Sequence, residues 1–224
     1  GTALRVRIAA VIPARNEAAR VGDVVRGLAP FGLHRVLVVD DGSSDGTGAA
    51  AAAAGAEVLR REGGGKGAAL RAGIAALQAD VFDYYLFLDG DGQHDPADLA
   101  GFLARLEAAP RPDILLGSRY GDRARIPRAR WAANALGSWI LGRIAGVAWR
   151  DTQCGFRMVR KAVLERLDLR AEGFAIEMEV IMKAADRRLV WAEVPVRALY
   201  QPGWRSQMRG GWDVWAIARF SLRC

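Results

Sequence analysis

Short apolar runs alternate with longer amphipathic stretches through the first half of the chain. The runs predict strands, and the stretches, in which apolar residues recur every three or four positions, predict helices. Strands are expected at residues 6–12, 35–39, 56–59, 84–88 and 114–117, and helices at 20–28, 45–54, 67–77 and 95–107. Such alternation is typical of an α/β protein with a mostly parallel sheet flanked by helices.

The pattern becomes less regular after residue 118. The elements expected there are a basic loop at 119–130, helices at 131–144 and within 173–187, a strand at 190–196 and an amphipathic terminal helix at 210–223. In the terminal helix, Trp212 and Trp215 are interleaved with arginines. Tryptophan beside arginine suits the headgroup region of a membrane, and a helix that packs on the protein core is an equally good explanation.

The length of 224 residues suffices for one domain with a sizeable core. The two cysteines, Cys154 and Cys224, indicate neither a disulfide framework nor a zinc site, so we expect a reducing, cytoplasmic setting. The longest charge-free apolar region of the second half, 131–142, is shorter than the roughly 20 residues that a bilayer-spanning helix needs. We therefore expect a protein that does not cross the membrane and contacts only its cytoplasmic face.

The formal net charge of +7 is distributed unevenly. Residues 1–117 carry −3 and residues 118–224 carry +10. An acidic first half suits a metal site, and a basic second half suits an anionic partner such as phosphate, anionic lipid or nucleic acid. A merely solvated basic surface is the alternative explanation.

Two carboxylates and an amide follow the apolar run 84–88 at intervals of two residues. Alternate residues of an extended chain point the same way, so Asp89, Asp91 and Gln93 can present oxygens to one point. A divalent cation prefers such oxygen ligands. The alternative, taken alone, is an acidic turn after a strand.

Polar loops also follow the first two predicted strands. Pro13, Arg15 and Glu17 follow the first, and Asp40 and Asp41 follow the second. Ligands of open α/β sheets bind beyond the carboxyl ends of the strands, so both loops should face one crevice, where carboxylates can accept from a base or a ribose. The first loop lacks the G-x-G-x-x-G pattern of dinucleotide-binding proteins.

A glycine run at 63–65 precedes Lys66 at the start of a predicted helix. The run does not form a P-loop, because Gly67 replaces the hydroxyl residue that would bind magnesium. A lysine at a helix start can still meet phosphate or ribose, and a purely structural loop is equally consistent with these glycines.

Five motifs occur in a fixed order along the chain. They are P-x-x-N-E at 13–17, D-D-G-S-S-D-G-T at 40–47, G-K-G at 65–67 with Arg71 and Gly73, D-x-D-x-Q at 89–93, and Gly117-Ser118-Arg119. In this order they resemble the inverting glycosyltransferases of family 2. The resemblance implies the GT-A fold, a Rossmann-like α/β sandwich whose D-x-D motif binds Mg²⁺ or Mn²⁺ against the diphosphate of a nucleotide sugar.

Three later segments narrow the resemblance. D-T-Q-C-G-F-R at 151–157, Glu177-Met178-Glu179 and E-V-P-V at 193–196 resemble the dolichyl- and polyprenyl-phosphate sugar synthases. The resemblance implies transfer of a hexose from a UDP- or GDP-sugar to a polyprenyl or dolichyl phosphate. Ala14-Arg15 stands where the family usually has a tyrosine, and the loop 200–209 departs from the mannosyl enzymes, so the sugar stays open.

The same resemblance assigns roles to single residues. The nucleotide site would comprise Pro13, Arg15, Glu17, Asp40, Asp41, Lys66 and Asp89. Asp89, Asp91 and Gln93 would hold the metal, and Arg119 would meet the acceptor phosphate. We expect Asp91, Asp151 and Arg119 to carry the catalysis.

These expectations give one catalytic domain over 1–224. Residues 1–117 would form the nucleotide-sugar and metal half, 118–200 the acceptor half, and 201–224 a loop and an amphipathic helix. The arginines expected to position an anionic acceptor are Arg119, Arg123, Arg125, Arg128 and Arg130.

Several alternatives stay open at this point. A phosphate acceptor, with a second pKa near ~6, needs no strong base, whereas a hydroxyl acceptor on a glycan or small molecule would need Asp151 or Glu177. A nucleotidyltransferase would release pyrophosphate instead of a nucleoside diphosphate. A nucleic-acid-binding module is disfavoured by the acidic, glycine-rich first half.

Overall fold

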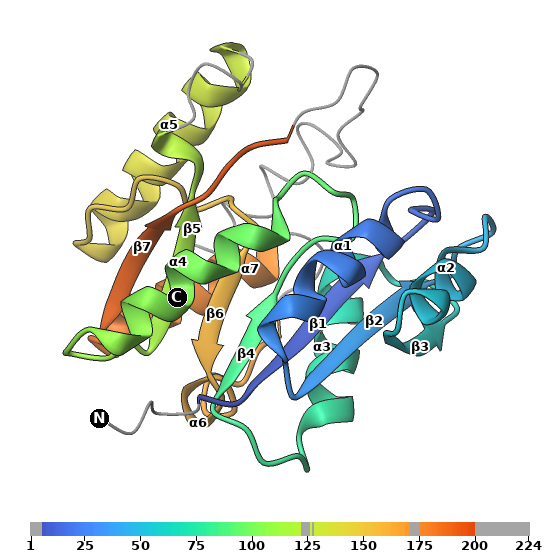
Figure 1. The fold of residues 1–224 in the computed structure, drawn as a ribbon. Coiled ribbons are helices and arrows are strands. Elements are labelled where there is room, and N and C mark those ends of the chain that lie inside the picture. Colours follow the sequence, from blue (N-terminus) through green and yellow to red (C-terminus); the bar gives the residue numbers. More distant parts are fainter. Residues whose placement is uncertain (1–5, 122–125, 127, 171–174, 200–224) are drawn as a thin grey trace.

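The described part of the chain is built on one twisted sheet (Figure 1). The structure is a computed structural model that describes residues 6–121, 126, 128–170 and 175–199, with the backbone alone at 128–130. Its strands are β1 (Ile8–Ala14), β2 (Arg35–Asp41), β3 (Glu57–Arg61), β4 (Tyr84–Phe87), β5 (Ile114–Ser118), β6 (Arg157–Arg160) and β7 (Trp191–Pro195). They form a seven-stranded sheet in the order β3-β2-β1-β4-β6-β5-β7.

Most neighbouring strands run parallel. β1 pairs in parallel with β2 and β4, β2 with β3, and β5 with β7. The exception is β6, which lies antiparallel between β4 and β5. The mostly parallel α/β sheet expected from the alternating pattern is therefore confirmed.

The sequence pattern did not predict β6. Its four residues, R-M-V-R, carry an arginine at each end and lack the apolar run that marks the other strands. Pairing on both sides buries the segment, and Arg157 is buried because its guanidinium donates to three backbone carbonyls. A strand of the second half thus lies among the strands of the first.

Helices cover both faces of the sheet (Figure 1). They are α1 (Val21–Leu28), α2 (Thr47–Ala53), α3 (Gly65–Leu77), α4 (Leu99–Glu107), α5 (Arg128–Ala145), α6 (Lys161–Leu164) and α7 (Ala175–Asp186), with 3-10 turns at Ala29–Phe31 and Pro96–Asp98. Side chains alternate along β1, so that Ala10 and Ile12 face α1, α2 and α4, whereas Ala9 and Val11 face α3 and α7. Each face of the sheet therefore has its own apolar core.

The expected helices and strands are present with ends shifted by a few residues. Asp95 caps the helical segment as expected, because its carboxylate accepts from the N–H of Ala97 at 2.9 Å. Across the described ranges, the structure contains no helix with the length and apolarity that a bilayer crossing requires. The terminal helix expected at 210–223 and the loop 200–209 lie outside the described residues.

α3 packs unusually closely on β1 and β2 at Gly73. A Cβ built there would overlap with Cγ1 of Val11 and lie 3.1 Å from Cγ2 of Val39. This close contact fixes the beginning of α3, and with it Lys66, relative to the ends of β1 and β2.

We expect Gly73→Ala to lower the free energy of unfolding. Overpacking against two branched side chains costs about 1–3 kcal/mol, which exceeds the gain of up to about 1 kcal/mol in helix propensity. Urea unfolding measures the difference. The matched control is Gly137→Ala in α5, where the added Cβ meets only the flexible amide of Gln153 at 3.1 Å. Equal or greater stability of Gly73→Ala would contradict the packing argument.

Candidate active site

The polar residues predicted from the loops gather at the carboxyl ends of β1, β2 and β4. The N–H of Gly90 donates to the carbonyl of Pro13 at 3.2 Å, which joins the loop after β4 to the end of β1. The N–H of Gly65, at the start of α3, donates to Asp41 at 2.7 Å. The loops after three strands and the beginning of α3 therefore form one edge of the site.

Asp40 and Asp41 hold loops in place. Asp40 accepts from the N–H of Ser43 at 3.0 Å, and Asp41 also lies 3.4 Å from Nη1 of Arg61. Both carboxylates are buried. If Asp40 and Asp41 contact a nucleotide as predicted, they must do so while keeping these hydrogen bonds and the ion pair within the protein.

The loop after β1 is tied to the loop after β2. The N–H of Asn16, a residue at φ 56°, donates to Ser43 Oγ at 2.9 Å, and its side-chain oxygen accepts from the N–H of Ser44 at 2.9 Å. Glu17 is buried and pairs with Arg20 at 3.1 Å. Among the residues predicted for the nucleotide in this loop, Arg15 has an exposed side chain.

Asp89, Asp91 and Gln93 follow β4 as expected. The N–H of Gln93 donates to Asp91 Oδ1 at 3.0 Å, and its side-chain amide donates to Asp91 Oδ2. Burial, together with the neighbouring Asp89 carboxylate, raises the pKa of Asp91 to about 6. The two carboxylates therefore repel each other at close quarters.

The chemistry of these side chains suits a divalent cation. Mg²⁺ takes one or two carboxylates from a protein and completes its coordination with water and substrate phosphates. A dication would relieve the repulsion that raises the pKa of Asp91. Where side chains are described, no group of three or more His, Cys, Asp and Glu could hold a metal ion. Asp89, Asp91 and Gln93 thus stay predicted ligands, with a bound substrate needed to complete the coordination.

Lys66 lies between two carboxylates. Its Nζ is 2.7 Å from Asp89 Oδ1 and 2.9 Å from Oε1 of Glu177 on α7. Burial acts to lower the pKa of Lys66, but the attraction of Asp89 and Glu177 outweighs burial and raises it. Lys66 is therefore a fixed cation beside the predicted metal ligands.

The sequence argument missed two neighbours of this cluster, Gly155 and Arg157. A Cβ at Gly155 would overlap with Asp89 Oδ2, so only glycine lets the chain pass this close. Arg157 donates to the carbonyls of Cys154, Thr152 and Glu177 at 2.6–2.7 Å. Both belong to the D-T-Q-C-G-F-R motif, which signalled the family but not these contacts.

Arg119 and Asp151 form a buried ion pair. Arg119 donates to Asp151 through Nε at 2.7 Å, Nη2 at 2.9 Å and its backbone N–H at 3.1 Å. Burial acts to raise the pKa of Asp151, but the hydrogen bonds and charge of Arg119 hold it below its usual value. Their predicted roles toward an acceptor stay predictions, with Asp151 placed to orient Arg119.

His94 lies between the two clusters. Burial, with Arg119 next in size, lowers the pKa of His94 to about 3, and both Asp151 and Lys66 act on it electrostatically. Its ring is therefore neutral near pH 7. Nε2 lies 3.9 Å from Cys154 Sγ, and the ring centroid lies 6.0 Å from that of Phe156. His94 is thus within electrostatic reach of both Lys66 and the Arg119–Asp151 pair.

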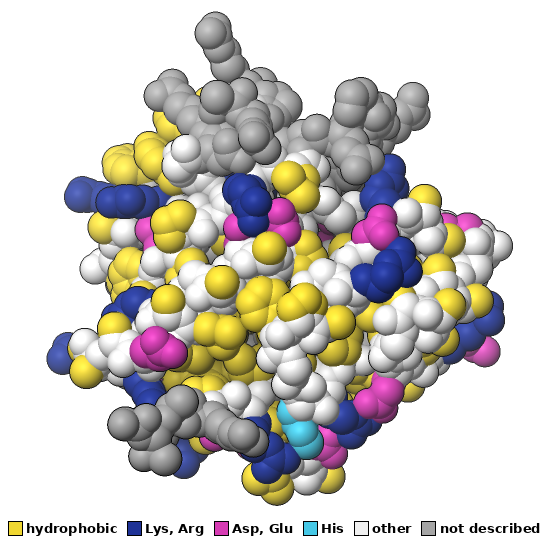
Figure 2. All heavy atoms as spheres, viewed as in Figure 1, with side chains coloured by type: hydrophobic (Ala, Val, Ile, Leu, Met, Phe, Trp, Pro, Cys, Tyr) yellow, Lys and Arg dark blue, Asp and Glu magenta, His cyan; other side chains and the backbone are white. Residues whose placement is uncertain are grey.

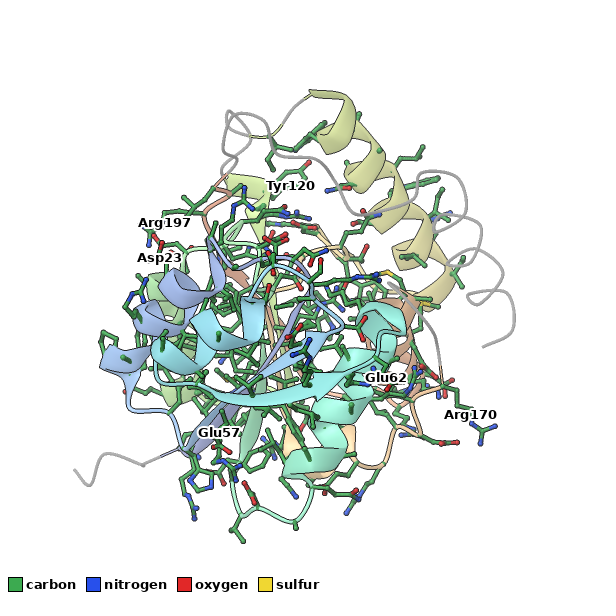
Figure 3. The ribbon with its side chains drawn as sticks, turned by 90° about the vertical axis from the view of Figure 1, so that its right-hand side faces the viewer. Asp23, Glu57, Glu62, Tyr120, Arg170 and Arg197 are labelled. Atoms are coloured by element: carbon green, nitrogen blue, oxygen red, sulfur yellow. The ribbon has the colours of Figure 1, made fainter. Side chains whose placement is uncertain are left out.

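A shallow pocket, open to solvent, adjoins the Arg119–Asp151 pair. Its walls include Arg119, Tyr120, Ile126, Trp131, Arg150 and Asp151. Tyr120 lies beside α5, with its ring centroid 5.6 Å from that of Trp131 (Figure 3). Of the other predicted arginines, Arg123 and Arg125 lie outside the described residues, as do the side chains of Arg128 and Arg130.

Comparison with known proteins identifies the family. The profile described as Glycosyl transferase family 2 matches residues 9–168. Glycosyltransferase AglJ of Haloferax volcanii is 33% identical over 195 residues, which cover 85% of this chain and 62% of that protein. Polyprenol monophosphomannose synthase of Mycolicibacterium smegmatis is 31% identical over 178 residues, 72% of this chain and 65% of that protein. The chain therefore spans less than two thirds of the length of either relative.

The fold has a counterpart among solved structures. The structure of glucosyl-3-phosphoglycerate synthase from Mycobacterium tuberculosis in complex with Mg²⁺ and UDP superposes with a TM-score of 0.74 at 24% identity, covering 98% of this chain and 80% of that one. At this identity the likeness shows the fold alone, which is the expected GT-A fold. The match over residues 9–168 shows that the chain belongs to glycosyltransferase family 2.

Proposed function

We propose that the protein transfers a hexose, with inversion, from a UDP- or GDP-sugar to a polyprenyl or dolichyl phosphate, and that it uses Mg²⁺ or Mn²⁺. The observation that carries the proposal is the pair Asp89–Asp91 at the end of β4, beside Lys66, in a chain of this family. The name of the Mycolicibacterium smegmatis relative supports a polyprenol-linked acceptor.

The donor binds along the carboxyl ends of β1, β2 and β4. Asp89 and Asp91, with Gln93, hold the divalent cation, which when bound supplies Lewis-acid stabilisation of the departing diphosphate. Lys66 contributes a fixed positive charge to the same phosphates. The exposed side chain of Arg15 reaches toward the nucleotide from the loop after β1.

The acceptor binds in the pocket beside α5. Arg119 and Arg150 line it and supply positive charge for a phosphate. Asp151 orients Arg119 through two side-chain hydrogen bonds. A phosphate acceptor is already ionised near neutral pH, so the site needs no strong base. This suits a site in which the carboxylates of Asp151 and Glu177 are already engaged by cations.

One face of α5 supports contact with a lipid surface. Leu136, Trp139, Ile140 and Ile144 recur at helical spacing, and all four are exposed, Trp139 to 62%. Figure 2 shows apolar side chains beside Lys and Arg at the upper left, where α5 lies in Figure 1. An apolar stripe next to cationic side chains suits a headgroup interface. We therefore propose peripheral membrane contact through α5.

The proposed activity predicts release of UDP or GDP when the donor sugar and polyprenyl phosphate are supplied together with Mn²⁺. Radiolabelled sugar should appear in the lipid fraction. Soluble glycans and small hydroxyl acceptors are compared at equal concentration. Labelling of a soluble acceptor alone would replace the lipid-phosphate proposal with transfer to a hydroxyl, and pyrophosphate as the product would indicate a nucleotidyltransferase.

Asp91→Asn should lower kcat at least about 100-fold, because charge stabilisation by a bound dication is worth several kcal/mol. The substitution keeps the size of the side chain and removes its charge. The control is Asp23→Asn on α1, at an exposed carboxylate (Figure 3). Circular dichroism checks the fold of both. Wild-type turnover by Asp91→Asn at saturating Mn²⁺ would exclude Asp91 as a metal ligand.

Arg150→Gln should raise KM for polyprenyl phosphate about threefold to tenfold, the effect of losing about 0.7–1.4 kcal/mol at an exposed charge. The affinity for the nucleotide should not change, because Arg150 lines the proposed acceptor pocket rather than the loops after β1, β2 and β4. The matched control is Arg170→Gln, an exposed arginine paired with Asp168 (Figure 3). Initial rates at varied acceptor give both constants, and an unaltered KM for the lipid would place the acceptor elsewhere.

A further inference from the structure

The ammonium of Lys66 forms an ion pair with Asp89, one of the predicted metal ligands. Lys66 Nζ lies 2.7 Å from Asp89 Oδ1, which is ordinary for a charge-assisted hydrogen bond. The Lys66 side chain is only 13% exposed, so water screens the pair weakly. Any cation that uses Oδ1 must therefore share it with Lys66 or displace the ammonium.

Asp89 lies between Lys66 and the backbone of Gly155. Its second oxygen, Oδ2, faces the backbone of Gly155 so closely that a Cβ there would overlap with it. Gly155 is followed by Phe156, which is buried and stacked on Phe102 at 4.6 Å, so this backbone is firmly packed. The carboxylate is thus confined between a rigid backbone and a cation.

Glu177 also pairs with the ammonium of Lys66. Its Oε1 lies 2.9 Å from Lys66 Nζ, and its Oε2 lies 4.0 Å from Nη2 of Arg157. Arg157 cannot move toward the metal ligands, because its three nitrogens donate to three backbone carbonyls. Lys66 is therefore shared between Asp89 and an anion that is itself held in place.

The charges of this cluster balance without a metal ion. Lys66 and Arg157 offset Asp89 and Glu177, whereas Asp91 makes no ion pair with any cation in the part of the chain that the structure describes. A divalent cation that approaches Asp89 and Asp91 meets the positive charge of Lys66 at the first of them. A diphosphate that binds together with the cation can form an ion pair with Lys66 in place of Asp89.

We propose that Lys66 is an internal cation that competes with the divalent metal for Asp89, and that the donor diphosphate relieves this competition by drawing the ammonium to itself. Metal and nucleotide then bind cooperatively, and by linkage each raises the affinity for the other by the same factor. Glu177 is a positioning residue: its ion pair with Lys66 weakens the ion pair between Lys66 and Asp89. This inference rests on the proposed metal and donor site.

The test measures Mn²⁺ binding to the full chain. Electron paramagnetic resonance detects the bound ion, and no substrate turnover is needed. Without nucleotide, Lys66→Met should bind Mn²⁺ about tenfold more tightly than wild type, a change of about 1.4 kcal/mol. Glu177→Gln should bind Mn²⁺ more weakly than wild type, because the Lys66 ammonium then pairs more strongly with Asp89. With UDP or GDP present, the affinity of the wild type should rise, and that of Lys66→Met should rise much less.

Two controls separate this competition from general effects of charge and folding. Lys161→Met removes the same charge from an ion pair with Glu165 on α6, at the opposite end of the sheet, and should leave Mn²⁺ binding unchanged (Figure 1). Lys66→Arg keeps the charge and should not tighten binding. Melting temperatures show whether each variant is folded.

The outcomes are distinguishable. Opposite shifts in Lys66→Met and Glu177→Gln support the competition, whereas a purely structural role would weaken Mn²⁺ binding in both. If the wild type binds Mn²⁺ but Lys66→Met binds it no more tightly, this inference fails and the proposed function stands. If the wild type binds no Mn²⁺ with either nucleotide, the inference and the proposed metal site fail together.

Discussion

The structure depends on neutralising carboxylates that a parallel sheet brings together at one edge. Strands that end side by side deliver Asp41, Asp89 and Asp91 into a partly dry region, where an uncompensated charge is costly. Backbone N–H groups and buried cations offset them, and Lys66 serves two carboxylates at once. Asp91 makes no ion pair with a cation among the described residues, and burial together with the Asp89 carboxylate raises its pKa to about 6. The same constraint on buried charge therefore underlies the proposed position of a dication.

A single segment, residues 151–157, joins the two sides of the site. It begins at Asp151, which binds Arg119 beside the proposed acceptor pocket, and passes Asp89 at Gly155. It ends at Arg157 in β6, where pairing with β4 and β5 fixes it in the sheet. One segment therefore contacts both clusters.

The loops of the site were predictable from the sequence because they follow clear apolar strands. Asp89, Asp91 and Gln93 follow β4, and the loops after β1 and β2 meet as expected at the carboxyl ends. β6 was not predictable, because its four residues show no strand period of their own and are ordered by pairing on both sides. The contact between Lys66 and Glu177 was equally hidden, since α3 and α7 lie far apart along the chain.

The sequence by itself determined the fold class, the order of most elements and the family, and it predicted a set of site residues that follow the strand ends. Those properties follow from periodicity, capping and motif spacing, which act between residues close together in the chain. Only the tertiary structure decided which charges pair, that Arg119 is bound by Asp151 and that Lys66 lies on Asp89. Ion pairing among buried groups depends on desolvation and on packing between distant segments, and neither is written in the local pattern.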